Sequence, residues 1–105
     1  MRMPEKAESP SRPPPNSEVK KHLDLALAFL EEGGSLARKN PAQASEKLYK
    51  AAEESVKLLA IHLGLTGALS RVGRRGRWAA ADLEKAVEAI SRKLGEWFRA
   101  AWDAA

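Results

Sequence analysis

The segment 40–65, NPAQASEKLYKAAEESVKLLAIHLGL, constrains the fold of this chain more than any other. It opens with Asn40 and Pro41, residue types that favour the N-cap and the first position of a helix, and no further proline or glycine follows until Gly64. Small and apolar residues recur along it at spacings of three and four, which predicts an amphipathic helix. This stripe consists of Ala44, Leu48, Ala51 or Ala52, Ser55, Leu59 and His62 or Leu63. Because small residues let a second helix approach closely, we expect this segment to be the spine of a helical bundle.

The segment before it predicts another helix, with Ser17 or alternatively Asn16 as the N-cap. Gly33 and Gly34 are expected to end this helix or to interrupt its last turn. Its apolar residues are Leu23, Leu25, Leu27, Phe29 and Leu30. They span a broader surface than one neighbouring helix would need.

The second half of the chain predicts a third long helix that starts near Asp82, and a break at Gly95. The apolar stripe of this helix is Leu83, Ala86, Val87, Ile90 and Leu94. Residues 66–78 contain three glycines and predict a loop with at most a turn of helix. Residues after Gly95 predict a fourth helix that is short or truncated.

Length and composition place these helices in one domain. A chain of 105 residues accommodates one domain at most, which we assign to residues 17–105. Residues 1–16 hold five of the six prolines and predict a disordered arm. The predicted fold is therefore an all-α antiparallel bundle of three long helices plus a short or truncated fourth.

The chain has no long apolar run, no signal-like start and no cysteine. These features predict no membrane association, no thiolate metal site and no disulfides, and they favour a cytoplasmic protein. No spacing of His and carboxylate residues matches a metal site, and no cofactor is expected. His62 on the apolar stripe is interpreted as a partly buried structural residue, His22 as a surface residue, and Glu54 as a solvated or interface carboxylate.

Positive charge is concentrated in one short segment. The formal net charge is +4, and residues 66–78 contain four arginines and no acid. Arginine matches phosphate geometry, glycine lets a backbone approach closely, and tryptophan can stack on a base. The resulting candidate site for an anion or nucleic acid is Arg71, Arg74, Arg75, Arg77 and Trp78. A solvated loop is the alternative reading of the same residues.

Aromatic residues are concentrated near the end of the sequence. The fourth helix predicted after Gly95 is too short to be stable on its own. Its aromatic residues must therefore pack on the bundle, on a second copy, or on further helix that the chain as given lacks. Together with the broad apolar surface of the first helix, they predict self-association. The candidate residues are Leu25, Phe29, Trp97, Phe98 and Trp102.

Several stretches resemble one known family. The run ASEKLYKAAEESVKLLA, residues 44–60, is similar to the archaeal PaREP family of small helical proteins, which is placed near the HEPN superfamily. LALAFLEEG at residues 25–33, DLEKAVEAI at residues 82–90 and the tryptophan pattern ending at Trp102 extend the resemblance. The resemblance implies an antiparallel HEPN-like bundle and a homodimer, and no established reaction.

Some relatives in that superfamily are ribonucleases that use an Arg, a spacer of four to six residues, and a His. Here no Arg lies within the six residues before His62, and the nearest Arg before His22 is Arg12. We therefore expect a non-catalytic, self-associating helical module that acts through protein contacts. Two alternatives stay open: an RNA- or DNA-binding accessory protein, and a ribonuclease whose catalytic His lies outside this chain.

Overall fold

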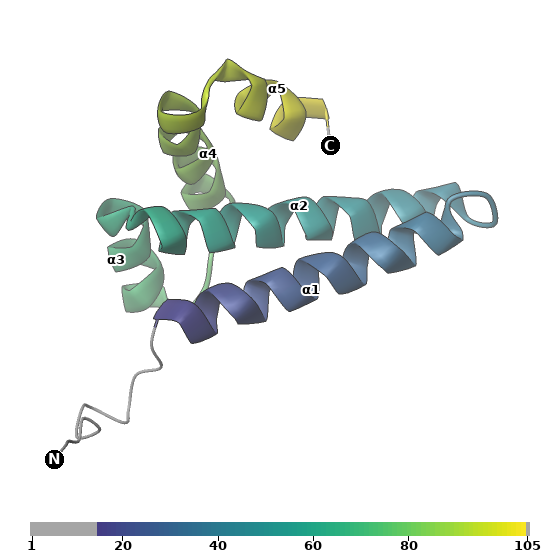
Figure 1. Cartoon of the computed structure of the whole chain (residues 1–105), viewed down its shortest axis with the longest axis horizontal. Helices are drawn as coiled ribbons and strands as arrows, with labels where there is room; N and C mark the ends of the chain where they lie inside the picture. Colours follow the sequence, from purple (N-terminus) through teal and green to yellow (C-terminus); the bar gives the residue numbers. More distant parts are fainter. Residues whose placement is uncertain (1–14, 105) are drawn as a thin grey trace, which may run out of the picture.

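A computed structural model of the chain describes residues 15–104, and this part consists of helices and short connections (Figure 1). The helices are α1 (Pro15–Leu36), α2 (Pro41–Leu63), α3 (Thr66–Arg75), α4 (Ala80–Leu94) and α5 (Glu96–Ala104). No strand occurs between residues 15 and 104. The all-α prediction is confirmed.

The two longest helices, α1 and α2, lie side by side and run in opposite directions (Figure 1). α2 begins as predicted, because the Asn40 side chain accepts a hydrogen bond from the Gln43 N–H at 3.2 Å and Pro41 follows at the first position. It ends at Gly64, whose φ of 67° is left-handed, a conformation that glycine adopts without steric cost. Both ends of α2 were therefore predictable from local chemistry.

α1 is longer than predicted at both ends. It starts at Pro15, two residues before the expected N-cap, and continues through Gly33 and Gly34 to Leu36. Gly33 is buried against α2, where a Cβ would lie 2.6 Å from the Leu48 Cδ2 atom. Close packing thus holds the helix together across a residue that weakens helices by about 1 kcal/mol on propensity alone. The rest of the predicted disordered arm, residues 1–14, lies outside the described residues.

The predicted number of helices was wrong, because most of the expected loop at 66–78 is the helix α3. Ala68 is buried and Leu69 packs against the core, so one side of α3 has apolar contacts despite the glycine-rich sequence. Left-handed Gly76, with a φ of 79°, ends it. Gly95, with a φ of 122°, separates α4 from α5, and the predicted break there is confirmed.

The apolar core lies between α2 and α4 and is closed by α3 and α5 (Figure 1). Its buried members are Val56, Ala60, Leu83, Ala86, Val87 and Ile90. The predicted stripe of α4 is confirmed except for Leu94, which is 41% exposed. None of the residues in this core comes from α1.

In the part of the chain that the structure describes, no helix has both the length and the apolar composition that crossing a bilayer requires.

Candidate protein-interaction surface

α1 carries two adjacent rows of residues at the alternating three- and four-residue spacing that is typical of helix–helix contacts. The first row faces α2 and contains Val19, His22, Ala26, Phe29, Gly33 and Leu36. His22, Ala26 and Gly33 are buried in this contact. α1 packs against α2 and makes few contacts with the other helices.

The second row, which we name the outer leucine row, consists of Leu23, Leu27 and Leu30. Each lies one residue after a member of the first row, so it is rotated about 100° around the helix axis. These side chains are 43%, 55% and 54% exposed, respectively. Single exposed leucines are ordinary, but a contiguous apolar row on one helix is typical of an interaction site. α1 therefore carries an apolar row that α2 leaves largely uncovered.

The predicted self-association residues on α1 lie beside this row rather than on it. Phe29 is half-buried within the α1–α2 hairpin, and the ammonium groups of Lys47 and Lys50 each lie 5.7 Å from its ring centre. Leu25 is exposed, one residue before Ala26 and on the other side of the helix from Leu27. Phe29 is thus used inside the hairpin, and the most exposed large apolar side chains of α1 are those of the outer leucine row.

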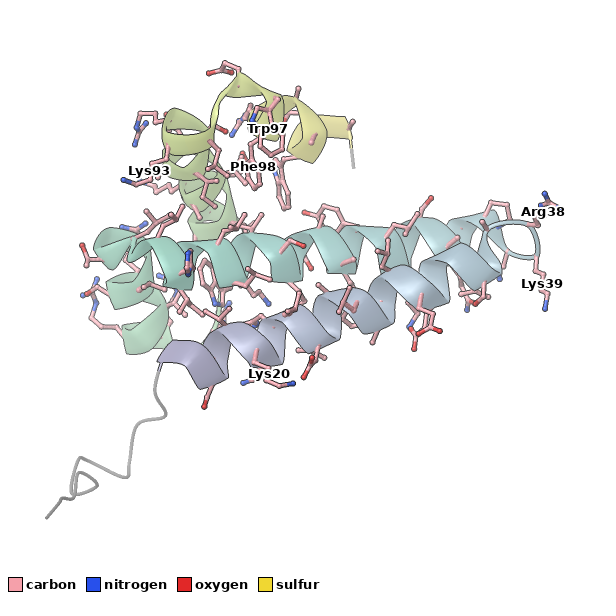
Figure 2. The ribbon with its side chains drawn as sticks, viewed as in Figure 1. Lys20, Arg38, Lys39, Lys93, Trp97 and Phe98 are labelled. Atoms are coloured by element: carbon pink, nitrogen blue, oxygen red, sulfur yellow. The ribbon has the colours of Figure 1, made fainter. Side chains whose placement is uncertain are left out.

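The structure divides the predicted aromatic cluster of α5. Phe98 and Trp102 pack against the core, and the Trp102 indole N–H donates a hydrogen bond to Glu84 at 3.0 Å. The Trp102 ring also lies 5.6 Å from that of Tyr49 on α2. Trp97, next to Phe98 on α5 (Figure 2), remains 62% exposed although its N–H donates to the Leu94 carbonyl. One aromatic of the three is therefore available to a partner.

A buried polar network joins α1 to α2. The Nδ1–H group of His22 donates a hydrogen bond to the Glu54 carboxylate at 2.6 Å, and the Lys57 ammonium donates to its other oxygen at 3.0 Å. Burial raises the pKa of Glu54, but the hydrogen bonds from His22 and Lys57 outweigh it and lower this pKa below its ordinary value. The network satisfies both carboxylate oxygens, so it positions α1 on α2 rather than forming a reactive site.

The predictions that His22 is a surface residue and that His62 is partly buried were therefore wrong, whereas Glu54, predicted as a solvated or interface carboxylate, lies at the interface of α1 and α2. His22 and Glu54 are buried, and His62 is exposed. His22 shares its row with Ala26 and Phe29, a helical signal that the sequence does contain. What the sequence did not indicate is which helix supplies the partner carboxylate.

The four arginines of residues 66–78 fall into two groups, of which one binds Asp82. Arg71 donates to one oxygen of Asp82 at 3.2 Å, Arg75 donates to the other, and the Ala79 N–H donates to that same oxygen at 2.9 Å. Hydrogen bonds from Arg75, Ala79 and Arg71 together lower the pKa of Asp82 to about 2. Two of the four predicted arginines are thus engaged in fastening α3 to the start of α4.

The remaining predicted residues of that segment differ in exposure. Arg74 and Arg77 are exposed, with Arg74 donating to the Ser70 hydroxyl at 3.1 Å, whereas Trp78 is half-buried against the core. The role of Asp82, which is to bind Arg71 and Arg75, was not predicted from the sequence. Its signal was its place three residues after Ala79, where an acidic side chain accepts from the N-cap N–H.

Between residues 15 and 104, no three histidine, aspartate or glutamate side chains gather into a candidate metal site.

Comparison with known proteins bears on the chain as a whole. The family described as archaeal PaREP1/PaREP8 matches residues 21–105, which includes most of α1 and every later helix that the structure describes. No curated protein and no solved structure matches the sequence. On the strength of the family match, this chain belongs to the archaeal PaREP1/PaREP8 family.

Proposed function

We propose that this protein is a non-catalytic helical module that pairs with a second copy of itself through the outer leucine row. The observation that carries the proposal is that Leu23, Leu27 and Leu30 are exposed in one row on a helix that packs mainly on α2. Burial of a leucine side chain stabilises by roughly 1.5–3 kcal/mol. Covering this row on two copies at once would supply much of the energy that association requires.

The charges beside the row favour a copy of the same chain as the partner. Helical periodicity puts Lys20 and Glu31 on one flank of the outer leucine row, near its opposite ends, and both are exposed. When two such helices pack in antiparallel orientation, each Lys20 approaches the Glu31 of the other copy. A self-complementary arrangement of this kind is what a two-fold interface requires.

Light scattering coupled to size-exclusion chromatography tests the proposal. The native chain is expected to elute as a dimer at micromolar concentration, and the variant Leu27→Glu/Leu30→Glu as a monomer. Because the proposed dimer buries both leucines, their loss should weaken association by at least ~100-fold. Both sites are more than half exposed in one chain, so the variant should keep its helical circular dichroism.

Ala28→Glu is the matched control, because Ala28 is exposed on the same helix and lies on the side away from the outer leucine row. It should leave the dimer intact. A native chain that is monomeric at these concentrations, or a double variant that still dimerises, would contradict the proposal.

We also propose that the paired chains form an HEPN-like bundle. The antiparallel α1–α2 hairpin (Figure 1) supports this, since two such hairpins joined along the outer leucine rows would place four helices side by side. A crystal structure of the dimer with α1 packed on α1 of the other copy is the expected result. Contact through α5 alone would contradict it.

Nucleic-acid binding is a second candidate, favoured by the exposure of Arg74 and Arg77 at the end of α3. Arg74→Gln/Arg77→Gln should then reduce affinity for single-stranded RNA and flatten its salt dependence. Unchanged affinity would exclude this site. A ribonuclease role is less well supported, because His22 is held by Glu54 and no Arg lies within the six residues before His62; an RNA-cleavage assay tests it.

A further inference from the structure

A second feature, on other helices, is a groove of 340 Å³ between the start of α3 and one side of α4. Three basic side chains line it, Arg71 from α3 and Lys85 and Lys93 from α4. No acidic residue lines the groove. Like charges gathered around a hollow repel one another, and an anion in the hollow would relieve that repulsion.

The charges of α4 lie on two neighbouring faces, with Lys85 at the border, because it also lines a hollow beside Glu84 and Glu88. Lys85, Ala89 and Lys93 follow one another at four-residue spacing along the groove. On the neighbouring face Glu84 pairs with Arg99 at 3.2 Å and Glu88 pairs with Arg92 at 3.8 Å. Neither groove lysine forms an ion pair with any residue between 15 and 104, and Lys93 projects away from the bundle (Figure 2). The groove therefore carries the cations of α4 that lack a carboxylate.

Arg71 lines the groove and is held in place by Asp82. Its Nε–H donates to the buried Asp82 carboxylate, which fixes the plane of the guanidinium group. Its Nη1 atom lies 3.8 Å from the point where a Cβ on Gly67 would be, over the first turn of α3. Because Asp82 is shared with Arg75, one carboxylate faces two arginines and leaves a net positive charge. The free end of Arg71 retains donors in the geometry that suits an oxyanion.

The floor of the groove is made of small residues. Gly64, Gly67, Ala68, Ala86 and Ala89 line it, and of these Gly64 and Gly67 are exposed. The first turn of α3 contains no acidic residue, and no side chain caps its N–H groups. These backbone donors add to a site that the three cations already define.

We infer that this groove binds the phosphate group of a small molecule, either free inorganic phosphate or a small phosphate ester. Arg71 supplies a fixed fork of donors, and Lys85 and Lys93 supply mobile charges from the opposite wall. The volume accommodates a phosphate with a small organic group attached. The inference does not rest on self-association, because its residues lie on α3 and α4 and the outer leucine row lies on α1.

Titration with inorganic phosphate at constant ionic strength, followed by ¹⁵N–¹H NMR of the full chain, tests the inference. The amides of residues 66–68 are expected to shift and to saturate. Lys85→Gln/Lys93→Gln should weaken phosphate binding at least tenfold. Arg38→Gln/Lys39→Gln is the matched control, since it removes the same charge at the far end of the hairpin (Figure 2) and should leave the affinity unchanged.

Two further titrations identify the source of the phosphate. A 5′-mononucleotide represents a small phosphate ester, and a short single-stranded oligonucleotide represents a nucleic-acid backbone. Saturable shifts at residues 66–68 with phosphate or with the mononucleotide support the inference. It is overturned if only the oligonucleotide binds, if sodium chloride produces the same shifts, or if the lysine variant binds phosphate as the native chain does.

Discussion

The two sides of α2 are built in different ways. On the side of α4, the contact consists of apolar residues that are almost wholly inaccessible, such as Val56, Val87 and Ile90. On the side of α1, the buried residues are small, as at Ala26 and Ala44, or charged, as in the His22–Glu54 pair. The leucines of the outer leucine row, by contrast, are 43–55% exposed. Where a helix places its large side chains thus distinguishes a contact that makes the domain stable from the surface that we propose pairs with a second copy.

The largest effect is expected on the α4 side. Ile90→Ala should lower the free energy of unfolding by about 3 kcal/mol, because a fully buried side chain leaves a cavity that the surroundings fill only in part. Leu94→Ala, on the same helix but 41% exposed, should cost well under half as much. Urea denaturation followed by circular dichroism measures both. Equal losses of unfolding free energy in the two variants would mean that burial of Ile90 between α2 and α4 adds no stability.

On the α1 side, the polar network should matter more than any single apolar contact. Glu54→Ala leaves His22 and Lys57 buried or half-buried without their acceptor, and should cost about 2 kcal/mol. Glu53→Ala is the matched control, being the same substitution one residue earlier on a more exposed side of α2. The same denaturation experiment separates them. A Glu54 variant as stable as the Glu53 variant would show that α1 is positioned by its small residues alone.

We name the contacts of Asp82 with Arg71, Arg75 and the Ala79 N–H the Asp82 clamp. Its contribution should be detected through the pH dependence of the free energy of unfolding rather than through a value at one pH. The pKa of Asp82 is about 2 in the folded chain against an ordinary value of 3.8, so its contribution is complete above pH 4 and is lost as pH falls from 4 to 2. The native chain should therefore lose stability more steeply over that range than Asp82→Asn. Asp103→Asn, at an exposed carboxylate, should follow the native curve. Parallel curves for the native chain and Asp82→Asn would exclude the clamp.

The contrast between the two sides also explains what the sequence could predict. The ends of α2 and the apolar stripe of α4 depend on residues close in sequence, namely Asn40, Gly64 and the Leu83–Ile90 spacing, so they were predictable. The helix α3 was not predictable, because its glycines and arginines favour a loop. The contacts that hold it as a helix come from Asp82 in α4, which binds Arg71 and Arg75. The partner of His22 lies thirty-two residues away, beyond any local pattern. The spacing of Leu23, Leu27 and Leu30 was visible in the sequence, but only the structure showed that α2 leaves these leucines exposed.

The smallest predicted effect tests how closely the two helices of the hairpin approach. Gly34 is exposed with open space around its Cα, so Gly34→Ala should stabilise the chain by up to about 1 kcal/mol through helix propensity. The same substitution at Gly33 brings a Cβ to 2.8 Å from the Leu48 Cγ atom and 3.3 Å from the Ala44 carbonyl oxygen, which forces α1 and α2 apart or displaces Leu48. Thermal unfolding of the two variants should therefore shift in opposite directions from the native chain. If Gly33→Ala stabilises as much as Gly34→Ala, the Leu48 side chain gives way freely, and the close approach of α1 to α2 contributes nothing to holding α1 in place.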